Sequence, residues 1–290
     1  MHADLDALLT ATYVLIDDFL PERPRRRGRP PAITDAELIT LLVAQSLLQV
    51  SDDRRFIAVA RRRLGHLFPY LPEQSGYSKR VRALAPQIER AINHLAFVSP
   101  SFFDGVRLLD STPVPCAASR ETVKRSELAG RAAYGYCRSH SRYFWGFRLY
   151  LLCAADGTPI AFELAAANEP ERKVAKEMLE RVALEGYTVI ADKGFAGEDF
   201  ESFMASRGAT FLRPDRKGER PRFGSLGAVR QWVESAFWSL KGQLGLERHG
   251  ARTLPGLCAR IGARLLALSA VLWHNWQIGE PGRRLSAYAH

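Results

Sequence analysis

The sequence predicts an α/β protein in which a small all-helical domain precedes a larger domain built on a mixed sheet. Three observations support this prediction. At 290 residues the chain has room for two unequal domains. Apolar residues make up 47% of the chain and charged residues 25%, as in folded globular proteins. The apolar pattern is helical up to about residue 100 and alternates between strands and helices from residue 103 onward.

The chain begins with a predicted helix and a basic linker. Residues 3–20 have helical periodicity, and a Pro- and Arg-rich stretch follows, so we expect an N-terminal helix within 1–22 and a linker over 23–32. Arg27 and Arg29 lie in an Arg-Gly-Arg-Pro tetrad that resembles the core of minor-groove AT-hooks. Specific A·T recognition, nonspecific phosphate contact and a solvated linker all fit this short pattern.

A helical domain is predicted over 33–100. Thr34 and Glu37 fit a capping box before an apolar stripe, which predicts a helix over 35–49. Further helical patterns cover 52–65, 77–84 and 86–98. Exposed arginines are expected at Arg54, Arg55, Arg61, Arg62 and Arg63. Such domains often bind DNA, although a solvated basic face explains these arginines equally well.

From residue 103 onward strands are predicted. The segments VRLLDSTPVP, WGFRLYLLCAADG and PIAFELAAA are apolar and lie close together in the chain, which predicts an antiparallel meander with a turn at Asp156-Gly157. A helix over 170–185, the strand YTVIAD, a helix near 197–207 and the strand ATFLRP follow, as in mixed α/β sheets. Predicted helices over 226–244 and 256–276 complete a domain over 101–280, before a tail over 281–290.

Three carboxylates are the candidate catalytic residues. Asp110 and Asp192 each end an apolar run, where a buried strand leaves its sheet, and such positions often hold active sites. Glu234 lies on a predicted helix between Arg230 and Lys241. On a continuous α-helix these three polar side chains share one face, which a surface salt-bridge ladder would also produce.

The combination is more specific than its parts. Two strand-end aspartates and a helical glutamate within a β-β-β-α-β-α order are how a ribonuclease H-like fold builds a three-carboxylate site. Phosphoryl transfer on DNA uses such a site, because two Mg²⁺ ions about 3.5–4 Å apart need hard oxygen ligands. We therefore expect Asp110, Asp192 and Glu234 to be catalytic metal ligands for Mg²⁺, with Mn²⁺ as a substitute.

These motifs resemble those of bacterial DDE transposases, with the greatest similarity to the insertion sequence 982 family. The resemblance covers nearly the whole chain and depends on LLDSTPVP around Asp110, VIADKGFAG around Asp192, and the R-x3-E-x6-K spacing of Arg230, Glu234 and Lys241. The related motif Y-x2-R-x3-E-x6-K would place its tyrosine at Gly227, so this chain departs from it there.

The resemblance implies roles for the residues around the carboxylates. Lys241 would contact a DNA phosphate, and Arg230 would position the helix or the DNA end. We add Lys193, Arg138 and Arg142 as DNA-binding candidates. Residues 119–148 carry seven basic and two acidic side chains interleaved with aromatic rings. Those rings would offer stacking surfaces, or would fill the core.

The implied function is DNA transposition. A net charge of +10 favours a polyanionic partner. We expect the chain to bind the terminal inverted repeats of an insertion sequence, cleave the DNA and join it to target DNA, as a homodimer in a synaptic complex. The alternatives are a ribonuclease H-like nuclease that does not join DNA, and a decayed DNA-binding derivative. No membrane partner is expected, and the cytoplasm, at the nucleoid, is the expected location.

Overall fold

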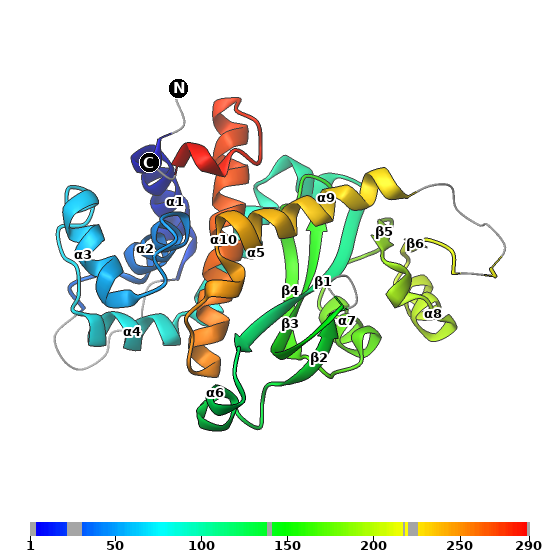
Figure 1. Cartoon of the computed structure of the whole chain (residues 1–290). Helices are drawn as coiled ribbons and strands as arrows, with labels where there is room; N and C mark the ends of the chain where they lie inside the picture. The colour runs from blue at the N-terminus through cyan, green and yellow to red at the C-terminus, as the bar shows by residue number, and fades with distance from the viewer. Residues whose placement is uncertain (1–3, 22–30, 138–140, 217, 220–225, 289–290) are drawn as a thin grey trace. The chain divides into compact units, whose positions relative to one another are not determined.

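The computed structural model describes residues 4–21, 31–137, 141–216, 218–219 and 226–288, without the side chains of 227–230. The chain divides into two compact units, which are described separately (Figure 1). The helical unit comprises Met1–Val98 and Ser239–His290, and the sheet unit comprises Ser99–Trp238. The C-terminal segment therefore belongs to the same unit as the N-terminal helices.

The helical unit begins with five helices. They are α1 (Leu5–Phe19), α2 (Asp35–Leu47), α3 (Asp53–Arg63), α4 (Gln74–Ala83) and α5 (Ala85–Phe97). The predicted capping box is present, because the Thr34 side chain accepts from the Glu37 amide while the Glu37 carboxylate accepts from the Thr34 amide. The predicted helix positions therefore hold to within a few residues at most ends.

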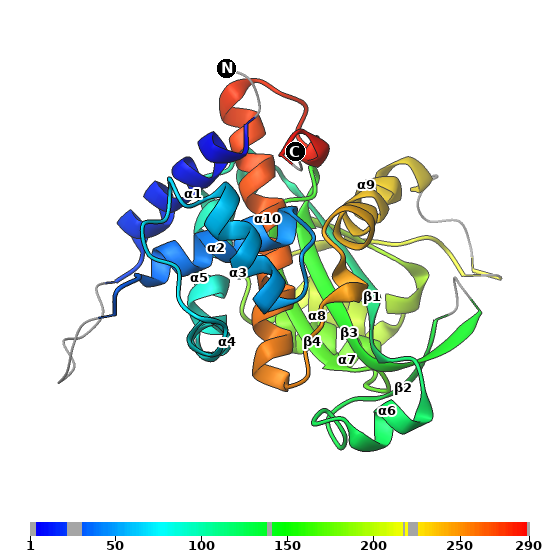
Figure 2. The ribbon, with the colours of Figure 1, turned by 60° about the vertical axis from the view of Figure 1, so that its left-hand side comes forward.

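The long helix α10 (Leu254–Ile278) is the centre of the helical unit. It packs against α1, α2, α4 and α5, as the two ribbon views also show (Figure 2). By length and composition α10 could span a membrane, but 83% of its most apolar 18-residue window is buried inside the protein. A central core helix has this composition, since it is apolar on every side.

The packing of α10 differs from the predicted domain limits. The sequence predicts a helical domain over 33–100 and places α10 in a domain over 101–280, whereas in the structure α10 supplies the core of the helical unit. The predicted tail also contains a short 3₁₀ helix, Leu285–Tyr288, which packs against α1. A five-helix domain without α10 would leave much of its apolar surface uncovered, which explains the arrangement. The functional division of the chain stays a prediction.

A buried polar network ties α10 to the N-terminal helices. The carboxylate of Asp53 accepts from Arg260 at 2.7 Å, from Gln45 at 3.1 Å and from Ser78 at 2.7 Å. Gln45 in turn accepts from the hydroxyl of the buried Tyr77 at 2.9 Å. The side chains of Asp53 and Arg260 are only 10% and 15% exposed. This network fixes the position of α3 against α2, α4 and α10.

The sheet unit contains a six-stranded mixed sheet. Its strands are β1 (Val106–Ala117), β2 (Ala133–Cys137), β3 (Arg142–Ala154), β4 (Pro159–Ala166), β5 (Thr188–Ala191) and β6 (Thr210–Leu212). β3 runs antiparallel to β1, β2 and β4, whereas β5 pairs in parallel with β1 and β6. The predicted meander of β1, β3 and β4 is confirmed, including the turn at Gly157, whose φ is +96°.

One strand was missed because it is short. β2 pairs with Arg142–Gly146 and β4 pairs with Phe147–Cys153, so the two strands follow one another along the same edge of β3. Five residues interrupted by Gly135 form a strand only once β3 supplies their partners. No strand was therefore predicted between VRLLDSTPVP and WGFRLYLLCAADG.

Four helices accompany the sheet. They are α6 (Arg120–Arg125), α7 (Glu171–Leu179), α8 (Glu198–Ser206) and α9 (Gly227–Trp238). α7 packs against β4, α8 against β6, and α9 against β1. Val233 and Ala236 of α9 are buried. Short 3₁₀ helices at Pro100–Phe103 and Lys193–Phe195 complete the unit.

Candidate active site

Two predicted site residues lie where the parallel pairing of β1 with β5 ends. The predicted strand end at Asp110 is wrong, because β1 continues to Ala117 along β3, whereas β5 does end directly before Asp192. Leu109 of β1 pairs with Ala191 of β5, so Asp110 and Asp192 take the next positions of the same register. Asp192 continues the strand direction, with φ −75° and ψ 159°. Since neighbouring strands lie roughly 4.8 Å apart, these two backbone positions are side by side. Both residues are partly exposed, so solvent reaches the sheet where this parallel pairing ends.

The residue after Asp110 helps to orient it. The backbone N–H of Ser111 donates to Oδ1 of Asp110 at 2.7 Å. The alternation of a β-strand points the Ser111 side chain to the opposite face of the sheet. There its hydroxyl donates to Oε1 of Glu171 at 2.6 Å. One backbone segment thus carries Asp110 on one face and a contact to α7 on the other.

Glu171, the first residue of α7, connects the two aspartate motifs. Its Oε1 accepts from Ser111, next to Asp110, and its Oε2 lies 2.8 Å from the point where a Cβ at position 194 would be. Gly194 is the second residue after Asp192, and any side chain there would collide with this carboxylate. The hydroxyl of Tyr150, which pairs with Ser111 in the sheet, is buried with no hydrogen-bond partner among the described residues. Burial, followed by the negative charge of Glu171, raises the pKa of Tyr150.

The turn after Asp192 is supported from α7 as well. The Phe195 amide donates to the Asp192 carbonyl at 3.0 Å, and the guanidinium of Arg172 donates to the Ala196 carbonyl at 3.0 Å. Gly197 has φ +157°, and a Cβ there would lie 2.1 Å from Nη1 of Arg172. Glycine is therefore required for the guanidinium to reach this backbone. The first turn of α7 holds the loop that carries Asp192.

Glu234 lies on α9, the helix that packs against β1. Its side chain is exposed, while Val233, Ala236 and Phe237 on the same helix are buried. Throughout the part of the chain that the structure describes, no three or more His, Cys, Asp or Glu side chains form a group able to hold a metal ion. The structure therefore pairs the two aspartate positions but does not assemble all three carboxylates into a metal-binding geometry.

The predicted common face of Arg230, Glu234 and Lys241 needs a correction. It assumed an uninterrupted α-helix over 226–244, but α9 ends at Trp238 and Ser239–Gln243 is a π-helical turn, closed by the Leu244 amide on the Ser239 carbonyl at 3.0 Å. A π turn contains more residues than an α turn, so it rotates Lys241 away from the α-helical phase. Lys241 lies in the helical unit and pairs with Glu247 at 3.7 Å.

The remaining DNA-binding candidates are placed only in part. Lys193 is exposed directly beside Asp192, and Arg142 is exposed at the start of β3. Arg27, Arg29 and Arg138 lie outside the described residues, and nothing can be said of the Arg230 side chain. Their DNA contacts stay predictions.

A known family profile covers the part of the chain that carries this geometry. The profile of the Transposase DDE domain matches residues 101–270, which is more than half of the 290 residues. The chain belongs to the DDE transposase family. The match includes Asp110, Asp192 and Glu234, and enzymes of this family use divalent metal ions.

Two solved structures of transposases are similar to this chain. A synaptic complex of the piggyBac transposase with hairpin DNA has 10% sequence identity and a TM-score of 0.48, over 97% of this chain and 75% of that one. A pre-cleavage Mos1 transpososome has 12% identity and a TM-score of 0.23, over 89% and 90% of the two chains. No curated protein matches the chain. Both likenesses are too distant to add to what the family match shows.

The carboxylates of Asp110 and Asp192 are suitable ligands for a divalent cation. Carboxylate oxygens are the ligands that Mg²⁺ and Mn²⁺ prefer, and two of them extend from adjacent backbone positions. The sequence analysis missed Glu171 and Arg172, which support these positions. The sequence contains little that marks these two residues as functional, because Glu171 begins an ordinary amphipathic helix after Pro170. Only folding brings Glu171 to Ser111.

Proposed function

We propose that this DDE transposase binds the terminal inverted repeats of an insertion sequence, cleaves the DNA with Mg²⁺ and joins the freed end to target DNA. The observation that carries the proposal is the parallel register of Asp110 and Asp192 within the family-matched segment. We further infer membership of the insertion sequence 982 family of bacterial elements, from the motifs around Asp110, Asp192 and Glu234.

The sheet supports a ribonuclease H-like fold for the catalytic unit. The sheet follows the order β2-β3-β1-β5-β6, with β4 on the same edge of β3 as β2. With this strand order, the point where the parallel pairing of β1 with β5 ends lies in the middle of the sheet. This arrangement favours an active site at Asp110 and Asp192, with α9 bringing Glu234 from its packing against β1.

We assign each residue of the site a role in phosphodiester cleavage and joining. Asp110 and Asp192 would hold the cation, with Glu234 as the third carboxylate. When bound, Mg²⁺ neutralises charge on the phosphate and activates a water or 3′-hydroxyl nucleophile. Ser111 orients the Asp110 carboxylate through its amide, and Glu171 and Arg172 hold the two backbone segments in register. Lys193, exposed beside Asp192, is suited to a DNA phosphate.

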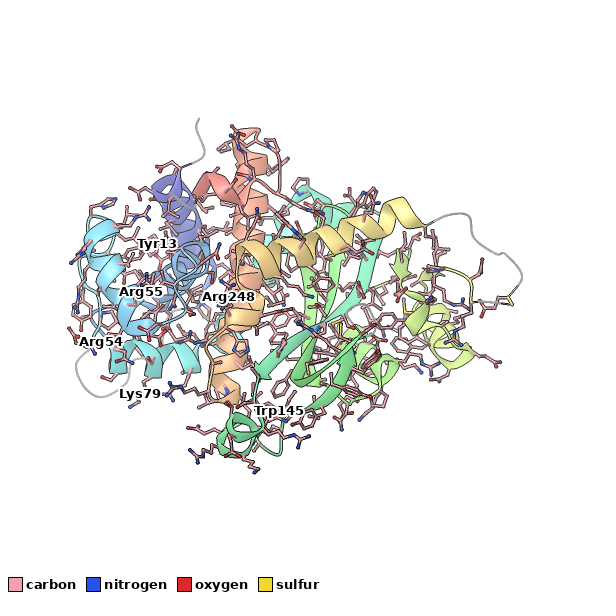
Figure 3. All side chains as sticks on the ribbon, in the orientation of Figure 1. Tyr13, Arg54, Arg55, Lys79, Trp145 and Arg248 are labelled. Carbon is pink, nitrogen blue, oxygen red and sulfur yellow. The ribbon has the colours of Figure 1, made fainter. Side chains whose placement is uncertain are left out.

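The helical unit has exposed basic side chains that could bind the DNA ends. Arg54 and Arg55 on α3 and Lys79 on α4 are exposed, and Figure 3 labels them on these adjoining helices. Exposed Lys and Arg side chains bind phosphates irrespective of sequence. We propose that this surface binds the terminal repeat. The protein would act as a homodimer, at the nucleoid in the cytoplasm.

A strand-transfer assay tests the proposal. The substrate is labelled duplex carrying the inverted repeats that flank the coding sequence, incubated with full-length protein, Mg²⁺ and plasmid target. Cleaved and joined products are expected from the native protein and neither from Asp192→Asn. Cleavage without joining would assign the chain to nucleases that do not transpose. Binding without cleavage by the native protein would identify a decayed DNA-binding derivative.

A further inference from the structure

The hairpin of β2 and β3 presents tyrosine rings to solvent. In its antiparallel register Tyr134 lies opposite Trp145, and Tyr136 lies opposite Tyr143. Directly opposed residues point to the same face of a sheet, and the rings of Tyr136 and Tyr143 are in contact, with centroids 5.0 Å apart. Tyr134, Tyr136 and Tyr143 are 55%, 43% and 77% exposed, and we call these three residues the tyrosine face.

The opposite face of this hairpin is packed, which holds the rings outward. Phe144 and Cys137 are buried with Ala167 in a small apolar cluster. Gly135 lies so close to Ala167 that a Cβ would be 2.7 Å from its Cβ and carbonyl oxygen. The guanidinium of Arg148 donates to the Tyr136 carbonyl at 2.8 Å. The backbone beneath the tyrosine face is therefore fixed, and its rings cannot turn inward without breaking this packing.

The tyrosine face lies on the same side of the sheet as Asp110. Asp110 pairs with Leu151 on β3, and Leu151 is six residues from Trp145. Since side chains alternate, an even separation keeps both on one face. Figure 3 labels Trp145 on the part of β3 that pairs with β2. At roughly 3.3 Å per residue, the rings begin about 20 Å from Asp110 along the strand.

The segment that contains the tyrosine face is rich in basic residues. Residues 119–148 hold seven basic and two acidic side chains. Arg125 and Arg131 precede the hairpin in sequence and are exposed. Arg142 pairs with Cys137 and therefore points to the packed face, away from the tyrosine face. Aromatic rings beside cations are the surface on which proteins stack the bases of single-stranded nucleic acid. In an intact duplex the base faces are covered by their neighbours, so such rings can stack only on unpaired bases.

We propose that the tyrosine face binds single-stranded DNA by stacking on unpaired bases. The proposal rests on the function proposed above, since DNA opened near the site at Asp110 would supply such bases on this side of the sheet. Arg125 and Arg131, which precede the hairpin in sequence, would bind the phosphates of the same strand. The tyrosine face thereby becomes a second DNA contact within the sheet unit, separate from the carboxylates.

Fluorescence titration of full-length protein without divalent metal tests the proposal. The probes are a single-stranded oligonucleotide carrying 2-aminopurine and its fully paired duplex. Tyr143→Leu removes the most exposed ring and keeps apolar volume, whereas Tyr143→Phe keeps the ring. We expect Tyr143→Leu to weaken single-strand binding at least about fivefold. Tyr143→Phe should stay within twofold of the native protein, and duplex affinity should change less than twofold in both.

A matched control separates stacking from general effects. Tyr70 is 49% exposed in the helical unit, and Tyr70→Leu should leave single-strand affinity unchanged. Equal single-strand affinity in Tyr143→Leu and the native protein would overturn the proposal. Equal losses for single strand and duplex would also overturn it, because they would indicate an electrostatic or structural effect. Failure of strand transfer with intact tyrosine-dependent binding would refute only the proposed function.

Discussion

The two units of this protein use their carboxylates in opposite ways. In the helical unit Asp53 is nearly buried and accepts hydrogen bonds from Arg260, Gln45 and Ser78. In the sheet unit Asp110 and Asp192 are partly exposed where the parallel pairing of β1 with β5 ends. A buried carboxylate needs full compensation and then fixes the elements that supply it. The carboxylates of Asp110 and Asp192 stay accessible to a cation and a substrate, as the proposed catalytic role requires.

The strongest test of this difference is loss of activity without loss of stability. Asp110→Asn and Asp192→Asn should each lower the rate of DNA cleavage at least about 10³-fold, because metal ions contribute several kcal/mol to the transition state. Urea unfolding should change by less than about 0.5 kcal/mol. Asp199→Asn is the control, since its side chain is 87% exposed in an ion pair with Lys176. Cleavage that survives in Asp192→Asn would remove this residue from the site.

The helical unit should show the reverse pattern. Asp53→Ala leaves Arg260 without its carboxylate and should lower the free energy of unfolding by about 3–5 kcal/mol, as measured in urea. Arg284→Ala removes the more exposed partner, 58% exposed, of the Arg284–Glu280 ion pair and should cost less than about 1 kcal/mol. If both variants lose equal stability, the buried network does not hold the unit together.

Glu171 tests whether the sheet unit also contains a positioning residue. Glu171→Ala removes the acceptor of the Ser111 hydroxyl and should lower cleavage about 10–100-fold, the usual effect of groups that orient metal ligands. Because Gln can still accept this hydrogen bond, Glu171→Gln should recover most of the rate. The Mg²⁺ concentration for half-maximal cleavage should rise in Glu171→Ala. If the Mg²⁺ concentration for half-maximal cleavage is the same in Glu171→Ala and the native protein, the role of Glu171 is purely structural.

The smallest expected effect is a pH dependence of the helical unit. Burial lowers the pKa of His274 below its ordinary 6.5, while Asp4 partly opposes this shift. The unfolded chain therefore binds a proton first as pH falls, so stability is complete above about pH 6.5 and is lost as pH falls through the folded pKa. The loss is at most about 1.4 kcal/mol per pH unit. Urea unfolding at pH 7.5 and 5 should show a smaller difference in His274→Gln than in the native protein, and an equal difference would assign the effect to other groups.

Local patterns predicted most of the secondary structure. The capping box of Thr34, the end of β5 before Asp192 and the start of α9 are all readable from neighbours in the chain. The predicted strand end at Asp110 was wrong, because β1 continues to Ala117 along β3. Family motifs then indicated a DDE transposase, and the family match agrees. The prediction failed where partners are distant, as for β2, which is a strand only beside β3.

What the sequence determined by itself is the identity and order of the elements, because apolar periodicity and turn residues act over a few positions. Only the tertiary structure decided that α10 completes the helical unit, that Glu171 bonds to Ser111 and lies against Gly194, and that Lys241 lies in a π turn after α9. These features depend on which surfaces are buried against each other across long separations in the chain. No local pattern encodes such contacts, since packing and hydrogen-bond compensation are satisfied only in the folded protein.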